Sequence, residues 1–289
     1  IYQLAENSLE INENNESNFY KLWSLLSKID IKISYPLFET AHTILPSENL
    51  SPENRNILFQ FIIKKNELIR AEYLEDLITG YFAAQCEIEE VDNTDFVFSS
   101  LIKVDEEESY ELFKREILAY LTDDDLKRQY VSLCLLPGFF VTYQTKTVND
   151  ISETLPIAID AAMKSEEHLR KGLVFLEAFS NSNKINLNDS ILIIDFITEV
   201  VSKCTDSNIQ YRTLDVCKNL TVNLDFFEKM IGIYQNIQPE SYAVFFSILI
   251  YFYRHESPIS MDKYQPFLVS LVEIFNESIQ KVSILSAAY

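Results

Sequence analysis

The chain has 289 residues, a net charge of −20 and only four glycines. So few glycines argue against an all-β or α/β fold of this length, because tight turns depend on glycine. The negative charge argues against nucleic acid and anionic membrane surfaces as partners, since both repel an acidic protein.

The first half of the chain has the apolar periodicity of α-helices. Five segments share this spacing: 16–29, 51–65, 71–85, 109–121 and 122–136. Ser51 followed by Pro52 is typical of a helix start. Thr122 is the expected cap of the fifth helix, with Asp123 to Asp125 in its first turn, where the helix dipole favours negative charge. Segment 87–106 has a weaker pattern, and we expect a short helix between acidic loops there.

The Pro137-Gly138 step interrupts this pattern. We expect it to end a helix at Leu136, because proline disrupts a helix interior. We also expect a hinge here between two parts of one array of helices, an N-terminal segment of degenerate repeats over 1–145 and clearer repeats over 146–289.

The second half of the chain repeats a rhythm of paired helices. The predicted pairs are 151–163 with 166–179, 189–204 with 208–220, 224–237 with 240–254, and 262–278 with 279–289. Landmarks in the first helices, near Pro156, Ile194, Lys229 and Pro266, recur about every 35–40 residues, which is the period of two-helix repeats. The loops within each pair are short and therefore make the two helices antiparallel neighbours.

The helices over 189–204 and 208–220 have apolar faces wider than one partner helix can cover. Stacking in a solenoid provides the additional neighbours. The sequence therefore predicts an all-α fold, an α-solenoid of stacked antiparallel helix pairs with about 12–14 helices. Cys217 and Leu214 are expected in its core, and Arg212 and Asp215 are expected to form an i,i+3 pair at the surface.

Several of these helices resemble HEAT and armadillo repeats. Residues 168–179 (HLRKGLVFLEAF) and 211–220 (YRTLDVCKNL) resemble the second helix, in which an arginine precedes small and apolar residues. Residues 153–163 (ETLPIAIDAAM) and 264–275 (YQPFLVSLVEIF) resemble the first helix, with a proline near its start. The resemblance covers about 150–289. Because 224–237 lacks the proline and 242–252 lacks the arginine, HEAT, armadillo and a degenerate helical array stay open as alternatives.

The sequence contains little that indicates catalysis. Its three histidines, His42, His168 and His255, are far apart in the sequence and show no zinc-ligand spacing. Isolated glycines rule out the phosphate-binding loops, and the carboxylate runs lie at predicted helix starts and in loops. We therefore expect no enzyme activity, no cofactor and no metal.

The four cysteines, Cys86, Cys134, Cys204 and Cys217, form no C-x-x-C pair. They favour buried free thiols in a reducing compartment, and so a cytoplasmic or nuclear location. The most apolar stretch, 242–253, is too short to span a bilayer, which needs about 20 residues, so no membrane insertion is expected. A start at Ile1 and an end within a predicted helix suggest a fragment of a longer protein.

These features favour a non-catalytic scaffold or adaptor that binds a partner protein with a basic surface or tail. The resemblance implies that second helices line the binding surface. The candidate residues there are Glu166, Arg170, Glu177, Arg212, Asp215 and Asn219. The alternatives are the regulatory helical region of a larger enzyme, such as a ubiquitin ligase or kinase, and a regulator of small GTPases.

Overall fold

A computed structural model describes residues 21–26, 35–45, 50–89, 91, 95–182, 185–220, 224–255, 269 and 272–280. Within these ranges every regular element is a helix, and no strand is present. The all-α class is therefore confirmed. The chain divides into two compact units, Ile1–Thr145 and Lys146–Tyr289.

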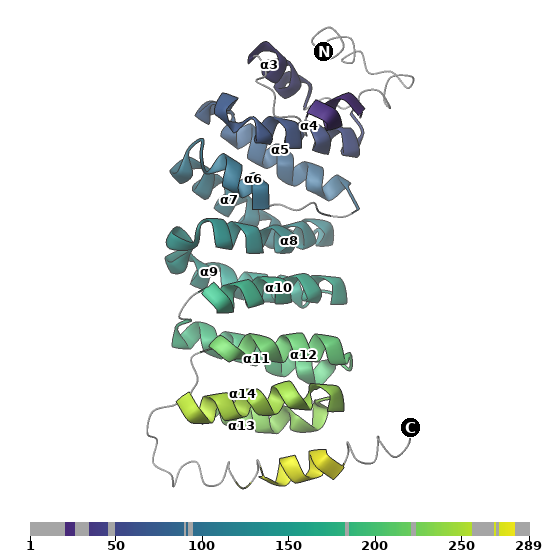
Figure 1. Cartoon of the computed structure of the whole chain (residues 1–289), viewed down its shortest axis with the longest axis vertical. Coiled ribbons are helices and arrows are strands. Elements are labelled where there is room, and N and C mark those ends of the chain that lie inside the picture. The colour runs from purple at the N-terminus through teal and green to yellow at the C-terminus, as the bar shows by residue number, and fades with distance from the viewer. Residues whose placement is uncertain are drawn as a thin grey trace. The chain divides into compact units, whose positions relative to one another are not determined.

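The first unit contains six labelled α-helices (Figure 1). They are α3 (Tyr35–Ile44), α4 (Pro52–Lys64), α5 (Leu74–Glu87), α6 (Asp95–Leu101), α7 (Glu106–Leu121) and α8 (Leu126–Thr142), with 3-10 helices at Asn66–Leu68 and Ala71–Tyr73. Helix α4 packs on α3, α5 and α6, and α7 packs on α5 and α8. The short helix expected within 87–106 is α6.

Aromatic rings hold the interior of the first unit together. Phe98 of α6 meets Phe113 of α7, with ring centroids 4.5 Å apart, and Phe139 of α8 at 6.1 Å. Phe82 of α5 also contacts Phe113, at 6.3 Å. One aromatic cluster therefore joins four helices, and such ring pairs add about 0.5–1.5 kcal/mol each beyond their burial.

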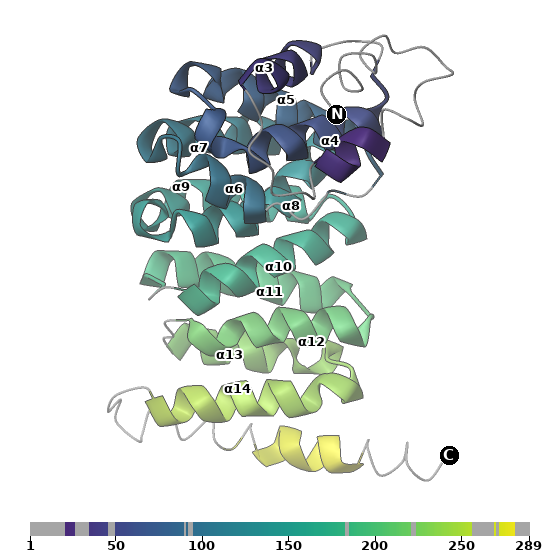
Figure 2. The same cartoon turned by 45° about the horizontal axis from the view of Figure 1, so that its top comes forward.

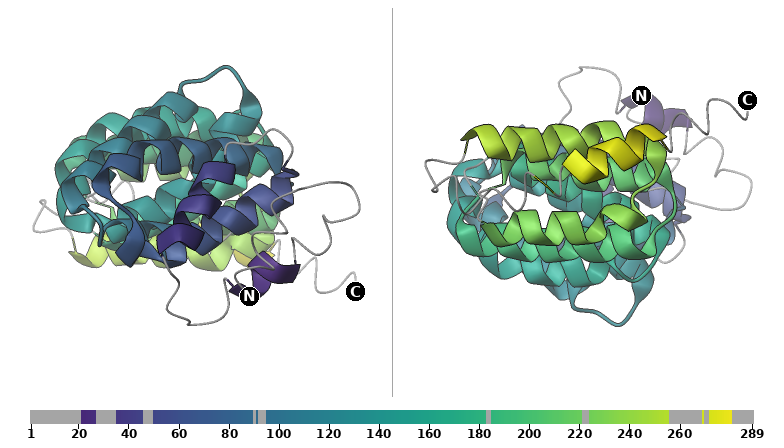
Figure 3. Two further views of the ribbon diagram at one scale, coloured as in Figure 1. Left: turned by 90° about the horizontal axis from the view of Figure 1, so that it is seen from above. Right: turned by 90° about the horizontal axis from the view of Figure 1, so that it is seen from below.

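The second unit contains the later helices (Figure 2). They are α9 (Gln144–Ala162), which begins at the boundary, α10 (Glu166–Ser182), α11 (Leu187–Lys203), α12 (Ser207–Asp215), α13 (Leu224–Ile233) and α14 (Tyr242–His255), with 3-10 helices at Val216–Asn219, Tyr234–Asn236 and Pro239–Ser241. Helix α11 packs on α12 and α13, and α12 packs on α10 and α14. The view from below in Figure 3 shows α13 and α14 in two separate rows.

Three of the four predicted helix pairs correspond to helices of the second unit: α9 with α10, α11 with α12, and α13 with α14. The fourth pair lies largely outside the described residues, which include only a helix over 272–280 from it. Helix α12 is shorter than expected. It ends at Asp215, and a 3-10 helix continues to Asn219. Cys217 and Leu214 are fully buried, as predicted.

One predicted helix cap is correct and one is wrong. Ser51 caps α4, and its Oγ accepts a hydrogen bond from Asn54 N at 3.3 Å. The cap of α8 is Asp125, whose Oδ1 accepts from Lys127 N at 2.8 Å. Thr122 instead ends α7, where its Oγ1 donates to Leu118 O at 2.9 Å. The three aspartates therefore lie before α8 rather than in its first turn.

The prediction that a helix ends at Leu136 is also wrong. Helix α8 continues through Pro137 and Gly138 to Thr142, and Gly138 does not adopt a positive φ. Phe139 and Phe140, which follow the proline, are both buried. Burying two such rings contributes more than the roughly 3 kcal/mol that an interior proline costs, so packing keeps the helix intact.

Gly172 gives a direct test of the packing between α9 and α10. A Cβ at this position would lie 2.4 Å from Ala162 Cβ, a contact that no rotation of either side chain relieves. We expect Gly172→Ala to lower the free energy of unfolding by about 1–3 kcal/mol through overpacking, although alanine is the better helix former. Denaturant unfolding of the two proteins measures this change.

Gly232 supplies the matched control. It is exposed on α13, and a Cβ there would have no neighbour within 4 Å. Gly232→Ala should therefore raise stability by about 0.5–1 kcal/mol. Changes of the same sign in both variants would contradict the close contact between α9 and α10.

Candidate functional site

The predicted partner-binding residues lie along the contact between α10 and α12. At one end, Arg170 of α10 donates from Nη2 to Glu166 Oε1 at 2.7 Å and to Asp206 Oδ2 at 3.2 Å. Glu166 is one helical turn before Arg170, whereas Asp206 precedes α12. Arg170 therefore connects the two helices through an exposed guanidinium.

Asp206 was not among the predicted site residues. It caps α12, and its Oδ1 accepts hydrogen bonds from the backbone of Asn208 at 2.8 Å and of Ile209 at 3.2 Å. These bonds, together with the nearby charge of Arg170, hold the pKa of Asp206 below its ordinary value. The sequence signal for this contact was spacing, because Asp206 follows Arg170 by 36 residues, within the expected repeat period.

At the other end of the contact, Arg212 of α12 forms a two-point ion pair with Glu177 of α10. Arg212 Nε donates to Glu177 Oε1 at 3.0 Å, and Nη2 donates to Oε2 at 2.9 Å. The expected pair between Arg212 and Asp215 is therefore wrong. The planar guanidinium matches a carboxylate in this parallel geometry, which neighbouring positions of one helix do not provide.

The two other predicted residues have different settings. Asp215 is half-buried at the end of α12, and its charge adds to the effect of burial in raising the pKa of the Cys217 thiol. Asn219 lies in the following 3-10 helix, and its side chain is outside the described residues. The structure thus brings four of the six candidates together in ion pairs between or within α10 and α12.

A small pocket of about 310 Å³ lies beside this contact. Its lining residues come from the ends of α9 and α11 and the starts of α10 and α12: Ala162, Met163, Ser165, Glu166, Leu169, Val200, Lys203, Cys204 and Ile209. Lys203 pairs with Glu199 at 2.5 Å. The pocket therefore has a largely apolar base and charged groups at its edge.

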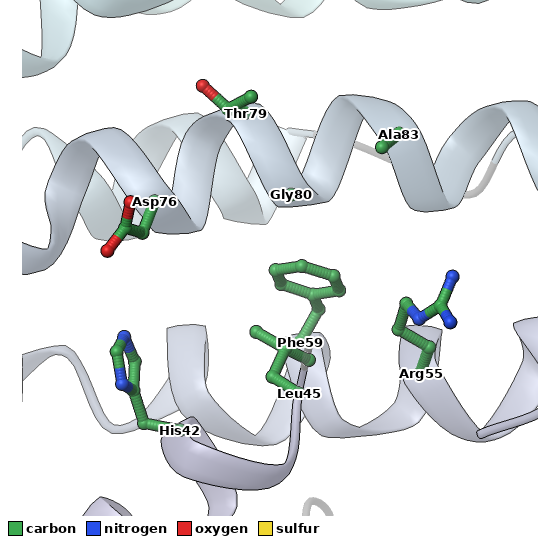
Figure 4. A pocket seen from close by; sticks show the side chains of 8 residues that line it. All are labelled: His42, Leu45, Arg55, Phe59, Asp76, Thr79, Gly80 and Ala83. Carbon is green, nitrogen blue, oxygen red and sulfur yellow. The ribbon is translucent and has the colours of Figure 1, made fainter. Parts of the chain in front are cut away.

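The first unit has a larger pocket of about 490 Å³ between α3, α4 and α5 (Figure 4). Asp76 on α5 and His42 on α3 face each other at one end, and Arg55 on α4 lies at the other. Burial lowers the pKa of His42, and the charge of Asp76 partly opposes this effect. The tilted ring of Tyr73 lies against the imidazole, with centroids 4.5 Å apart.

The contacts of His168 are those of a helix cap. Ser165 Oγ lies 2.7 Å from His168 Nδ1 and accepts a hydrogen bond from His168 N at 3.3 Å. This arrangement satisfies a donor in the first turn of α10, as side chains before a helix commonly do. No group of three or more His, Cys, Asp or Glu suited to a metal ion occurs in the part of the chain that the structure describes.

Comparisons with known proteins identify no family. No family model matches the chain. No curated protein sequence matches it. Among solved structures, aminopeptidase A of Legionella pneumophila, crystallised with aspartic acid, aligns with 15% identity and a TM-score of 0.28. The alignment covers 84% of this chain and 38% of the aminopeptidase chain, and at this TM-score it carries no argument about fold or activity. No described helix is long and apolar enough to cross a membrane.

A double-mutant cycle tests the ion pair between Arg212 and Glu177. Both side chains are partly exposed, at 38% and 31%, so solvent screens the interaction. We expect a coupling free energy of about 0.5–1 kcal/mol between Arg212→Gln and Glu177→Gln, decreasing as salt rises. A parallel cycle with Asp215→Asn in place of Glu177→Gln should give a coupling near zero. A larger coupling free energy in the Asp215 cycle than in the Glu177 cycle would instead support the pair expected from sequence.

Thiol labelling tests the burial of the cysteines. Cys217 is fully buried and its pKa is raised by burial, whereas Cys204 is half-buried and lines the smaller pocket. Iodoacetamide should therefore modify Cys204 in the native protein and Cys217 only on unfolding, because the thiolate is the reacting form. Peptide mass mapping gives the order in which the cysteines are modified. The Cys204→Ser variant shows which part of the labelling time course belongs to Cys204. Labelling of Cys217 before Cys204 would contradict this assignment.

Proposed function

We propose that this chain is a non-catalytic scaffold of helical repeats, of the HEAT or armadillo kind, that binds a partner protein through a basic segment. The proposal places the binding surface on the second helices of the repeats, with α10 and α12 at its centre. A cytoplasmic or nuclear location is part of the same proposal.

The observation that carries the proposal is the regular spacing of the polar contacts between helices in each unit. In the second unit, Arg170 bonds to Asp206 and Arg212 to Glu177, at separations of 36 and 35 residues. In the first unit, Thr79 Oγ1 of α5 donates to Glu116 Oε1 of α7 at a separation of 37 residues. Contacts at a nearly constant offset are expected where each helix pair stacks on the next.

Charge supports a basic partner. The single guanidinium of Arg170 pairs with two carboxylates, those of Glu166 and Asp206. These three residues at the start of α10 and α12, the acidic cluster, therefore have a net negative charge. The whole chain has a charge of −20. Such a field accelerates the approach of a cationic segment and weakens as salt rises.

The proposal is tested by capturing proteins from a cell lysate with the wild-type chain and, in parallel, with a variant of the proposed surface. The wild-type chain should retain a basic protein at low salt and lose it at moderate salt. The double variant Glu166→Gln with Asp206→Asn should retain several-fold less of the same protein, because the acidic cluster then has only the positive charge of Arg170. Asparagine still caps α12, so the helix should be preserved. Mass spectrometry identifies and quantifies the captured protein.

Glu108→Gln with Glu111→Gln, two exposed changes on α7, is the matched control for total charge. It should bind the partner nearly as the wild type does. Equal retention by both double variants, unaffected by salt, would overturn the proposed surface.

A further inference from the structure

We propose that the pocket between α3, α4 and α5 receives a lysine or arginine side chain from the partner's basic segment. This inference rests on the proposed function and assigns a contact point for the same class of partner within the first unit alone.

The pocket is large enough for one long side chain. Its volume of about 490 Å³ lies within the range of about 300–1,000 Å³ that small ligand sites occupy. The described residues that line it come from α3 and the position after it, from α4 and from α5. Figure 4 shows Phe59 between the polar groups at the two ends, so the middle of the pocket is apolar.

The missing Cβ of Gly80 leaves room for the Phe59 ring between α4 and α5. A Cβ at Gly80 would lie 2.9 Å from Phe59 Cζ, so only glycine allows the ring to remain where it is. The Phe59 ring also makes an edge-to-face contact with Tyr81 of α5, with centroids 6.1 Å apart. The Phe59 ring is itself almost completely buried, so an aliphatic stem such as that of lysine or arginine would lie on the exposed side chains of Thr79 and Ala83 on α5.

The charges of the pocket favour a cation. Arg55 at one end is already paired with Glu87. Asp76 at the other end is exposed and forms no ion pair with any described residue. An ammonium or guanidinium placed beside Asp76 gains a carboxylate partner, whereas an anion there would be repelled.

His42 adds a second acceptor beside Asp76. Because burial lowers the pKa of its imidazole, the ring is mainly neutral at neutral pH and offers one nitrogen as a hydrogen-bond acceptor. The tilted ring of Tyr73 packs against the imidazole. The cation site therefore has a charged acceptor and a neutral acceptor on two different helices.

The test uses a capped tripeptide, acetyl-Gly-Arg-Gly-amide, and its citrulline counterpart, which has nearly the same shape without the charge. We expect the arginine peptide to shift the amide NMR signals of Gly80 and Ala83 saturably, with millimolar affinity. The citrulline peptide should bind at least about threefold more weakly, and Asp76→Asn should weaken binding of the arginine peptide by about three- to tenfold.

Two control variants separate the pocket from general charge and folding effects. Asp124→Asn removes the same charge from an exposed loop of the same unit and should leave binding unchanged. Ala83→Leu fills the pocket from an exposed position of α5 and should abolish binding, whereas Ala243→Leu on α14 should not. Both alanines are exposed and leucine is a good helix former, so the fold is expected to tolerate either change.

A longer basic peptide distinguishes failure of this inference from failure of the proposed function. If that peptide binds and responds to Glu166→Gln with Asp206→Asn but not to Asp76→Asn, the pocket proposal is wrong and the proposed function stands. If it does not bind at all, the proposed function is wrong. Equal shifts from the arginine and citrulline peptides would also overturn the choice of a cation.

Discussion

The structure depends on helices whose apolar faces are too wide for a single partner to cover. Helix α11 shows this constraint most clearly, since Ile193, Ile197 and Val201 are almost completely buried while it packs on both α12 and α13. Each buried side chain of this size contributes about 1.5–3 kcal/mol, so a helix deprived of one neighbour would lose much of its stability. The same constraint explains why Gly172 is tolerated in α10, because close approach to α9 needs a position without a Cβ.

Apolar burial alone does not fix how one helix is placed on the next, and buried polar groups supply that information. Gln210 of α12 is fully buried. Its Nε2 donates to Cys204 O at 2.7 Å and Asn236 O at 2.8 Å, and its Oε1 accepts from Gln238 N at 2.8 Å. A shift of the helix by one turn would leave these groups without partners, at a cost of about 1–3 kcal/mol each. This side chain therefore ties α12 to the segments before and after it.

The sequence predicts the features that depend on neighbouring residues and fails where distant contacts compete with them. Helical periodicity and the Ser51 cap follow from local preference, and both agree with the structure. Thr122 and Asp125 are both acceptable caps by type, and the folded loop decides between them. The sequence also suggests that Pro137 ends a helix, but the burial of the residues after it outweighs that preference. The pocket on α3, α4 and α5 could not be predicted, because its lining comes from three separate segments.

The error over Arg212 shows what limits prediction of the site itself. Spacing along one helix offers Asp215 as a neighbour at i,i+3, whereas the observed partner, Glu177, is 35 residues away. That separation falls within the period expected of two-helix repeats, at which a distant position comes as close in space as the next turn of the same helix. Where such repeats are expected, charged residues should therefore be compared at the expected offset before they are paired within a helix. Applied to Arg170, this rule leads to Asp206, and the contact on α10 and α12 then consists of two ion pairs between helices rather than isolated surface charges.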